Sequence, residues 1–511
     1  MKKSYFLTKL LTVAGLISVG SLLACAVGPD FVKPDKPHAA GYMTGQTAES
    51  IDPIEKDNET SQHYVFGKDI PAEWWSLYHA EALDTLVREA LRANPDLEAA
   101  QAALREAHEN TASGEGAYYP SVEANFSPSR QKQSNISSSN LNSGSYVYNT
   151  FAAGLNVSFV PDVFGGTRRQ VEVLEAQENQ QRFQLEATFL TLTSNVVIGA
   201  IQEASLRAQI TATEDIIHTE QDQLDILIHQ EELGEAGEKD VLAQESLLAQ
   251  AELTLPGLQK QLEQQRDLLI ALVGRLPDEN IEQKFELTDL KIPSELPVTL
   301  PSKLVEQRPD IRAAEEQLHA ASAEIGVATA NMLPQINLTA ADGSMATRLS
   351  QLFVPGNGFW TLAAGFTQPI LEGGTLWHHR DAAKAAYDQA AAQYRSTVIT
   401  AFQNVADTLH AITADTKAYK IALRAEAAAS KSLKISQKEL ILGEIGPLDI
   451  LNAEQTWQQA RISLVQAEAS RYTDTAILFQ ALGGGWWNRD KKNNIIHEPH
   501  KDDAQTSASS K

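Results

Sequence analysis

Two long stretches of this chain lack the residues that usually end helices. One runs from Thr375 to Leu442 without a glycine or a proline, and the other, from Thr167 to Leu233, contains only Gly199. Both far exceed the usual globular helix of about 11–12 residues. At about 1.5 Å per residue, each stretch predicts a helix about 100 Å long. Rods of this length build no compact core, and they are typical of proteins that cross a large gap, not of enzymes.

The composition is acidic. The chain has 42 Lys and Arg against 66 Asp and Glu, a formal net charge of −24. This balance disfavours nucleic acid as a partner, because binding to phosphates depends on basic side chains. An acidic wall would instead favour cationic solutes. No stretch after the N-terminus approaches the roughly 20 apolar residues of a membrane-spanning helix.

The N-terminus has the features of a secretory signal. Three early lysines precede an apolar region over residues 10–19, which ends shortly before Cys25, the only cysteine of the chain. The segment resembles a bacterial lipoprotein signal, in which cleavage leaves the cysteine as the lipid-bearing first residue. The alternative is a cysteine discarded within the signal. Ala26, where an aspartate would point to the inner membrane, points by resemblance to the outer one. Acyl chains on Cys25 would anchor the chain by about 0.8 kcal/mol per buried methylene.

The chain repeats its own plan. Landmarks of the first half return in the same order in the second: Asn94-Pro95-Asp96-Leu97 as Arg308-Pro309-Asp310-Ile311, Gly165-Gly166-Thr167 as Gly373-Gly374-Thr375, Leu233-Gly234-Glu235 as Leu442-Gly443-Glu444, and Asp240-Val241-Leu242 as Asp449-Ile450-Leu451. Each copy predicts a helix after the Pro-Asp, a strand pair, a long helix after the Gly-Gly, and a return helix. The shared order indicates a duplication.

The strand pairs alternate with a period of two. Apolar side chains alternate with small or polar ones over 151–159, and the pattern returns over 122–127, 336–341 and 360–367. This is typical of lipid-facing barrel strands, although a half-buried strand of a soluble sheet shows it as well. Four strands cannot close a barrel, and lipid excludes an open sheet edge. Several chains must therefore share one barrel, and either two or three chains would satisfy this requirement.

The long stretches carry apolar stripes at 3-4 spacing, which pack helix against helix. In the second stretch the stripe comprises Val398, Phe402, Val405, Leu409, Ile412, Tyr419, Leu423, Leu433 and Leu440. Alanines beside it allow close approach on more than one side. A helix with two such seams can join a closed ring of helices.

Together these features resemble the outer-membrane factors of tripartite efflux pumps, and most of all the lipoprotein branch of the nodulation-protein-T type. The resemblance rests on the signal, the duplicated plan and three segments: residues 25–31 (CAVGPDF), 160–166 (VPDVFGG) and 369–374 (PILEGG). It covers roughly residues 25–485. It implies a mainly α fold with a membrane β-barrel: a homotrimer with a shared twelve-stranded barrel in the outer membrane, an α-barrel of long helices in the periplasm, and a mixed α/β equatorial belt.

The resemblance also implies a domain plan. Trp74-Trp75 is similar to the family's N-terminal tryptophan stretch and would pack in the belt. The expected segments are the signal peptide 1–24, an anchor and equatorial segment 25–92, a first repeat 93–275 (strand pair about 121–160, long helix 166–233, return helix 236–273), an equatorial linker 276–306, a second repeat 307–485 (strand pair about 335–371, long helix 374–442, return helix 447–482), and a disordered tail 486–511.

The functional positions implied by the family lie where the last return helix begins. By position, Leu448 matches an apolar pore ring and Asp449 an aspartate ring, while Asn452 stands where the family often has a second aspartate. This departure argues against a double-anion gate. Asp449 could equally be a first-turn aspartate that complements the helix dipole. The turns at Gly234, Gly237, Gly443 and Gly446 would contact a periplasmic adaptor.

No catalytic or metal-binding pattern emerges. His378 and His379 are adjacent and so diverge on a helix, and the Gly-Gly pairs lack the lysine and serine of a phosphate loop. The favoured hypothesis is a passive exit duct in the outer membrane, without a cofactor beyond the lipid on Cys25, whose partners are an inner-membrane transporter, an adaptor and outer-membrane lipid. The alternatives are a lipid-anchored periplasmic coiled-coil spacer and the duct of a protein secretion system.

Overall fold

The computed structural model describes residues 26–37, 41–42, 62–132 and 147–489. The signal peptide, Cys25 and most of the expected tail lie outside these residues. The chain divides into two units. The first comprises Met1–Lys33, Arg105–Gln180 and Ala314–Tyr394, and the second comprises Pro34–Leu104, Gln181–Ala313 and Arg395–Lys511.

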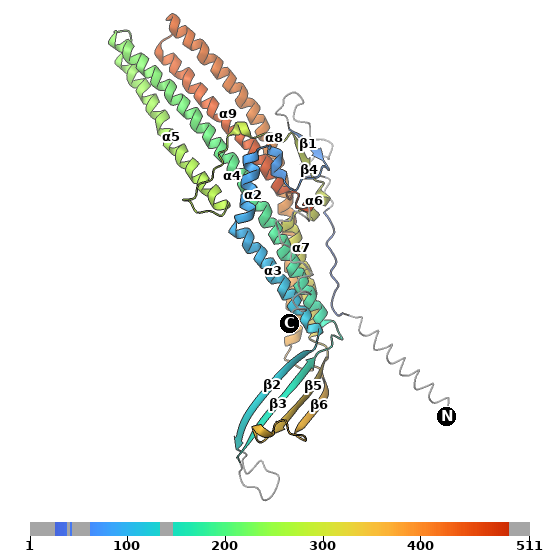
Figure 1. Cartoon of the computed structure of the whole chain (residues 1–511). Helices are drawn as coiled ribbons and strands as arrows, with labels where there is room; N and C mark the ends of the chain where they lie inside the picture. Colours follow the sequence, from blue (N-terminus) through green and yellow to red (C-terminus); the bar gives the residue numbers. More distant parts are fainter. Residues whose placement is uncertain (1–25, 38–40, 43–61, 133–146, 490–511) are drawn as a thin grey trace. The chain divides into compact units, whose positions relative to one another are not determined.

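The first unit contains one antiparallel sheet (Figure 1). Its strands are β2 (Ser121–Lys132), β3 (Val147–Phe159), β5 (Gln335–Ala346) and β6 (Gly358–Thr367), in the order β2-β3-β5-β6. Directly opposite residues of such a sheet share a face. The register sets Val122 opposite Val157, and Val157 opposite Ala340. The apolar rows of the four strands therefore meet on one face.

This sheet differs in two ways from a sheet in the core of a soluble protein. Within the described residues, β2 and β6 each pair along one side only. Every residue of β6 is exposed, including Trp360, Leu362 and Phe366. Asp342 is an exception on the apolar face, where it lies opposite Leu155 and Trp360. A single chain thus leaves two sheet edges and an apolar face uncovered.

The longest described elements are helices. Helix α4 (Gly166–Glu232) has 67 residues and continues through Gly199, and α8 (Thr375–Leu442) has 68. Each is followed by a 35-residue helix, α5 (Glu238–Leu272) after α4 and α9 (Pro447–Ala481) after α8. The helices before the strand pairs are α3 (Pro95–Glu115) and α7 (Pro309–Ala330). The order helix, two strands, long helix, shorter helix thus occurs in both halves.

In the second unit α4 and α5 form one helical hairpin, and α8 and α9 form another. Gln265 of α5 donates to the carbonyl oxygen of Gly199 in α4 at 3.1 Å. Helix α9 contacts both neighbours, because Arg461 Nη2 lies 2.7 Å from Asp215 Oδ2 of α4 and Trp457 Nε1 lies 3.0 Å from Glu426 Oε1 of α8. The two hairpins are therefore held together along α4 and α9.

The apolar stripe of α8 is partly buried within one chain. Val398, Val405, Leu409 and Ile412 are buried, and so is Leu433, but Leu423 is exposed in the single chain. Packing of the whole stripe against the other helices of a ring therefore stays a prediction. An α-helix turns every 3.6 residues, so a stripe with shorter spacing drifts around a long straight helix.

A compact core lies beside the helices of the second unit. It includes η1 (Trp74–Tyr78), α2 (Glu81–Ala93), α6 (Pro301–Gln307) and a parallel strand pair, β1 (His63–Phe66) with β4 (Glu295–Val298). Short turns η2 (Gly116–Tyr118), η3 (Leu287–Asp289), η4 (Leu349–Gln351) and η5 (Trp486–Asn488) complete the described elements. Trp74 and Trp75 are buried, and the Trp74 ring stacks on Phe479 with centroids 5.3 Å apart. The predicted packing role of this tryptophan pair is confirmed.

Candidate functional site: the helical turns and the N-terminal strap

The turns that close the two hairpins have the same construction. Gly234 follows α4 with φ +75°, and Gly443 follows α8 with φ +72°. A glycine in this left-handed region is the usual way to end an α-helix. The amide after each glycine donates to a carbonyl oxygen five residues earlier: Glu235 N to Gln230 O at 2.8 Å, and Glu444 N to Glu439 O at 2.9 Å. Both turns are exposed, as a contact surface for another protein must be.

The helices that follow also begin alike. Gly237 and Gly446 are the N-caps of α5 and α9, and an aspartate occupies the third helical position of each. Asp449 Oδ2 accepts from Gly446 N at 3.2 Å, and Asp240 Oδ2 accepts from Gly237 N at 3.4 Å. Such a side chain satisfies an amide that the helix leaves free. Asp449 therefore has a capping role at the start of α9.

The three suggested gate residues differ in what the structure says of them. Asp449 and Asn452 are exposed and lie on one face of α9, since residues three apart are neighbours on a helix. Ile450 and Leu451, between them, are buried. The side chain of Leu448 lies outside the described part of the chain. The structure thus leaves one carboxylate and one amide on the exposed face.

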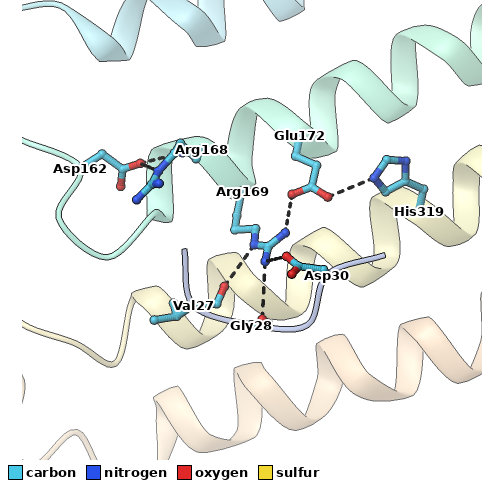
Figure 2. A network of polar contacts seen from close by, with 8 residues as sticks. All are labelled: Val27, Gly28, Asp30, Asp162, Arg168, Arg169, Glu172 and His319. Atoms are coloured by element: carbon cyan, nitrogen blue, oxygen red, sulfur yellow. Dashed lines mark hydrogen bonds and ion pairs between the residues drawn. The ribbon is translucent and has the colours of Figure 1, made fainter. Parts of the chain in front are cut away.

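Cys25 itself is not described, but the residues after it are. Residues 26–33, called here the N-terminal strap, lie against the first turns of α4 and against α7 (Figure 2). Val27 N donates to Phe164 O at 3.0 Å. The ring of Phe31 stacks on His319 of α7 at 4.4 Å, and Lys33 Nζ lies 3.1 Å from Glu315 Oε1. The strap is therefore held along its length.

Arg169 is the centre of this contact. Its side chain is only 5% exposed. Nε donates to Val27 O at 3.1 Å, Nη2 to Asp30 Oδ1 at 2.6 Å and Nη1 to Glu172 Oε2 at 2.6 Å. A guanidinium suits this task because its donors form a rigid planar fork. Figure 2 shows these contacts, with Glu172 continuing to His319.

His319 makes the strap contact sensitive to pH. Hydrogen bonds, first with Glu316 and next with Glu172, raise the pKa of His319 above its ordinary value. A raised pKa means that the folded state favours the cation. The stability that protonated His319 gives to the folded state is complete below about pH 6.5, the ordinary pKa of histidine. It is lost as the pH rises through the raised pKa.

Replacing Arg169 with alanine is expected to release the strap. The loss of its charge-assisted hydrogen bonds costs about 1.5–3 kcal/mol for each well-formed contact. Amide hydrogen exchange in the peptide that contains Val27 should accelerate by at least about tenfold, because one opening reaction now costs less. The matched control is Arg168→Ala, which removes the neighbouring contact to Asp162 and leaves the hydrogen bonds of Arg169 to the strap in place. Equal exchange in both variants would contradict the assignment.

Arg169, Glu172 and His319 could not be recognised as contact residues from the sequence. The local signal was weak, since a Thr-Arg-Arg helix start and a lone histidine are common on solvated helices. Within the described residues no group of three or more His, Cys, Asp or Glu side chains could hold a metal ion. Nor does any helix among the described residues have the length and apolar character needed to cross a membrane.

Known proteins resemble the chain along most of its length. Residues 86–275 and 300–484 match the family described as "Outer membrane efflux protein". The pyoverdine export outer membrane protein OpmQ of Pseudomonas aeruginosa is 29% identical over 421 residues, 81% of this chain and 87% of OpmQ. The toluene efflux pump outer membrane protein TtgC of Pseudomonas putida is 28% identical over 471 residues, 91% of this chain and 93% of TtgC.

The fold gives the same result. The solved structure of the outer-membrane channel OprN superposes with a TM-score of 0.81 at 25% identity, and the match covers 90% of this chain and 100% of OprN. The matched family segments span more than half of the sequence and include both long helices and both strand pairs. The chain therefore belongs to the outer membrane efflux protein family.

Proposed function

We propose that this protein is the exit duct of a tripartite export system, which carries small molecules across the periplasm and outer membrane together with an inner-membrane pump and a periplasmic adaptor. The observation that carries the proposal is the sheet of β2, β3, β5 and β6, whose apolar rows share one exposed face and whose two edges lack a partner in the described chain. Family membership supports the same function. The duct is passive, and the pump supplies the energy.

The sheet supports a barrel shared by three chains. Lipid excludes unpaired backbone groups, so β2 and β6 must find partners on other copies. The exposed Trp360, Leu362 and Phe366 would face lipid, and aromatic side chains are typical of the interfaces of such barrels. Twelve strands in a homotrimer agree with the family resemblance. Each chain would contribute its two duplicated halves, and thus two strand pairs and two helical hairpins.

The helices supply the length of the duct. With 67 and 68 residues, α4 and α8 each span about 100 Å at 1.5 Å per residue. A ring of hairpins from three chains would form the periplasmic α-barrel. The core around Trp74, with β1, β4 and α6, would form the equatorial belt.

The N-terminal strap supports the lipid anchor. We expect Cys25 to carry acyl chains after removal of residues 1–24. Through Arg169 the strap holds Ala26 and Val27 at the start of α4, just after β3 ends. A lipidated Cys25 would then emerge close to the membrane sheet of its own chain. This arrangement agrees with an outer-membrane location.

The relatives favour small molecules over proteins as the exported material. OpmQ is named for pyoverdine export and TtgC for toluene efflux. The spacer alternative has no comparable support, because a periplasmic spacer needs no lipid-facing strands. We place the adaptor contacts at the exposed turns of Gly234, Gly237, Gly443 and Gly446, and the pore gate at Leu448, Asp449 and Asn452.

The gate is tested by comparing Asp449→Ala with Asp240→Ala in planar bilayers. Both variants lose the same helix cap, which costs about 1 kcal/mol. Only Asp449 would form a ring of three carboxylates on the trimer axis, and such a ring selects cations. Asp449→Ala should open more readily and lose most of its cation preference, while Asp240→Ala should conduct like the unaltered protein. The same currents from all three forms would reduce Asp449 to a capping residue, and no channel at all would contradict the duct.

A further inference from the structure

Two carboxylates are buried between the helical hairpins. Glu220 of α4 is 2% exposed and Glu454 of α9 is 1% exposed, and Gln244 of α5, which contacts Glu220, is fully buried. They lie near the turns, about three helical turns before the end of α4 and about two turns after the starts of α5 and α9. Buried carboxylates close together cannot both stay ionised without a large cost. The packing of the two hairpins at Glu220 and Glu454 therefore requires that one of the two charges be removed.

The carboxylate of Glu220 accepts hydrogen bonds at both oxygens. Gln244 Nε2 donates to Glu220 Oε2 at 2.6 Å and to the main-chain oxygen of Glu220 at 2.9 Å. Gln458 Nε2 of α9 donates to Glu220 Oε1. Both carboxylate oxygens thus accept a hydrogen bond, one from each hairpin.

Glu454 is in the opposite situation. Its Oε2 atom is buried and accepts no hydrogen bond from the described residues, and the same holds for Gln244 Oε1. A proton on Glu454 would remove its charge and supply an O–H donor in a place with acceptors to spare. Burial first, and Glu220 second, raise the pKa of Glu454 to about 7.

The charged groups around this pair do not compensate it. On α9 and α4, Arg461 pairs with Asp215. On α8, Glu426 accepts from Trp457 and is itself acidic. On α5, Glu245 beside Gln244 is exposed. Glu220 remains the charged group that acts on Glu454.

We propose that Glu220, Gln244 and Glu454 form a proton-binding site that fastens α9 of the second hairpin to the first hairpin, and that loss of the proton loosens this contact near the turns. The expected effect of this site on the pore rests on the proposed duct function, since loosened hairpins at that end would widen the pore. The proton site itself does not depend on that function.

The direction of the pH effect follows from the pKa. The packed state binds the proton up to about pH 7, whereas a free glutamate releases it near pH 4.3. Packing therefore loses stability as the pH rises from about 4.3 to 7, and the penalty is constant above that range. The contact is tight at pH 5–6 and loose at pH 8. One proton changes the packing equilibrium about tenfold per chain between pH 6 and pH 8.

The test uses the full-length protein with Glu454→Gln, which imitates the protonated acid, and with the exposed Glu245→Gln as the matched control. Two measurements are made at pH 6 and pH 8: the thermal midpoint of unfolding in detergent, and the open fraction of channels in planar bilayers with potassium chloride. The unaltered protein and Glu245→Gln should have lower midpoints and about tenfold more opening at pH 8. Glu454→Gln should keep its pH 6 behaviour at pH 8.

The two measurements distinguish a failure of the proton site from a failure of the duct function. If Glu454→Gln changes the pH dependence of the midpoint but no form conducts, the proton site stands and the duct function fails. If all forms conduct and keep the same pH dependence in both measurements, the duct stands and the proton site is overturned. A Glu454→Gln midpoint below that of the unaltered protein at pH 8 would also overturn the site, because removing a buried charge should stabilise the packing.

Discussion

Replacing Arg266 with alanine is expected to destabilise the second unit by about 3 kcal/mol or more, because it removes several charge-assisted hydrogen bonds worth about 1.5–3 kcal/mol each, although Glu203 keeps its contact with Arg207 Nη2 at 2.7 Å. Arg266 Nη1 donates to Glu203 Oε1 of α4 at 2.8 Å, and Glu203 is fully buried. Arg266 Nη2 donates to Asn280 Oδ1 at 2.8 Å and to Ile281 O at 3.0 Å. One side chain thus joins α4, α5 and the segment that follows α5.

The measurement is the thermal midpoint of the detergent-solubilised protein at a fixed heating rate, because large membrane assemblies usually unfold irreversibly. Arg275→Ala is the matched control. Its partly exposed ion pair with Glu89, at 3.4 Å, should contribute no more than about 1 kcal/mol. Equal midpoints for Arg266→Ala and Arg275→Ala would contradict this account.

Much of the fold could be predicted from local sequence. The lack of glycine and proline over Thr375–Leu442 matches α8 residue for residue. The alternation around Phe151 places β3, and Gly234 and Gly443 end the long helices where expected. These features depend on the period of apolar residues and on backbone geometry, and both can be read from a few neighbouring positions.

The contacts that give the site its chemistry could not be predicted in this way. Arg169 meets Asp30 across 139 positions, and Glu220 accepts from Gln458 across 238. No local pattern marks such pairs, because a buried glutamate and a solvated one look alike in a helical sequence. The strands β1 and β4 were missed for a related reason, since four residues are too few for a period to show. The place of Asp449 at the start of α9 could be predicted because the turn is a local pattern, whereas its gate role comes from the family resemblance and stays a prediction.

Gly274→Ala is expected to have the second large effect. Gly274 follows α5 with φ +73°, and a Cβ there would lie 2.2 Å from Ala93 O and 2.8 Å from Ala93 C. Ala93 ends α2, and Asn94 after it caps α3 by accepting from Asp96 N and Leu97 N at 3.0 and 3.1 Å. Asn94 Nδ2 also donates to Leu272 O at 3.0 Å. Backbone cannot move aside like a flexible side chain, so the new methyl group would displace this junction.

The expected cost has two separable parts. The left-handed backbone conformation costs alanine about 1–2 kcal/mol relative to glycine, and loss of the Asn94 cap adds about 1 kcal/mol more. Gly234→Ala isolates the first part, because Gly234 has φ +75° and a Cβ added there would meet no atom within 4 Å. The thermal midpoint should therefore fall clearly further for Gly274→Ala than for Gly234→Ala. If both variants lower the thermal midpoint equally, α2 and α3 shift freely at their junction. The close contact of Gly274 with the Ala93 backbone would then not be the main source of the effect.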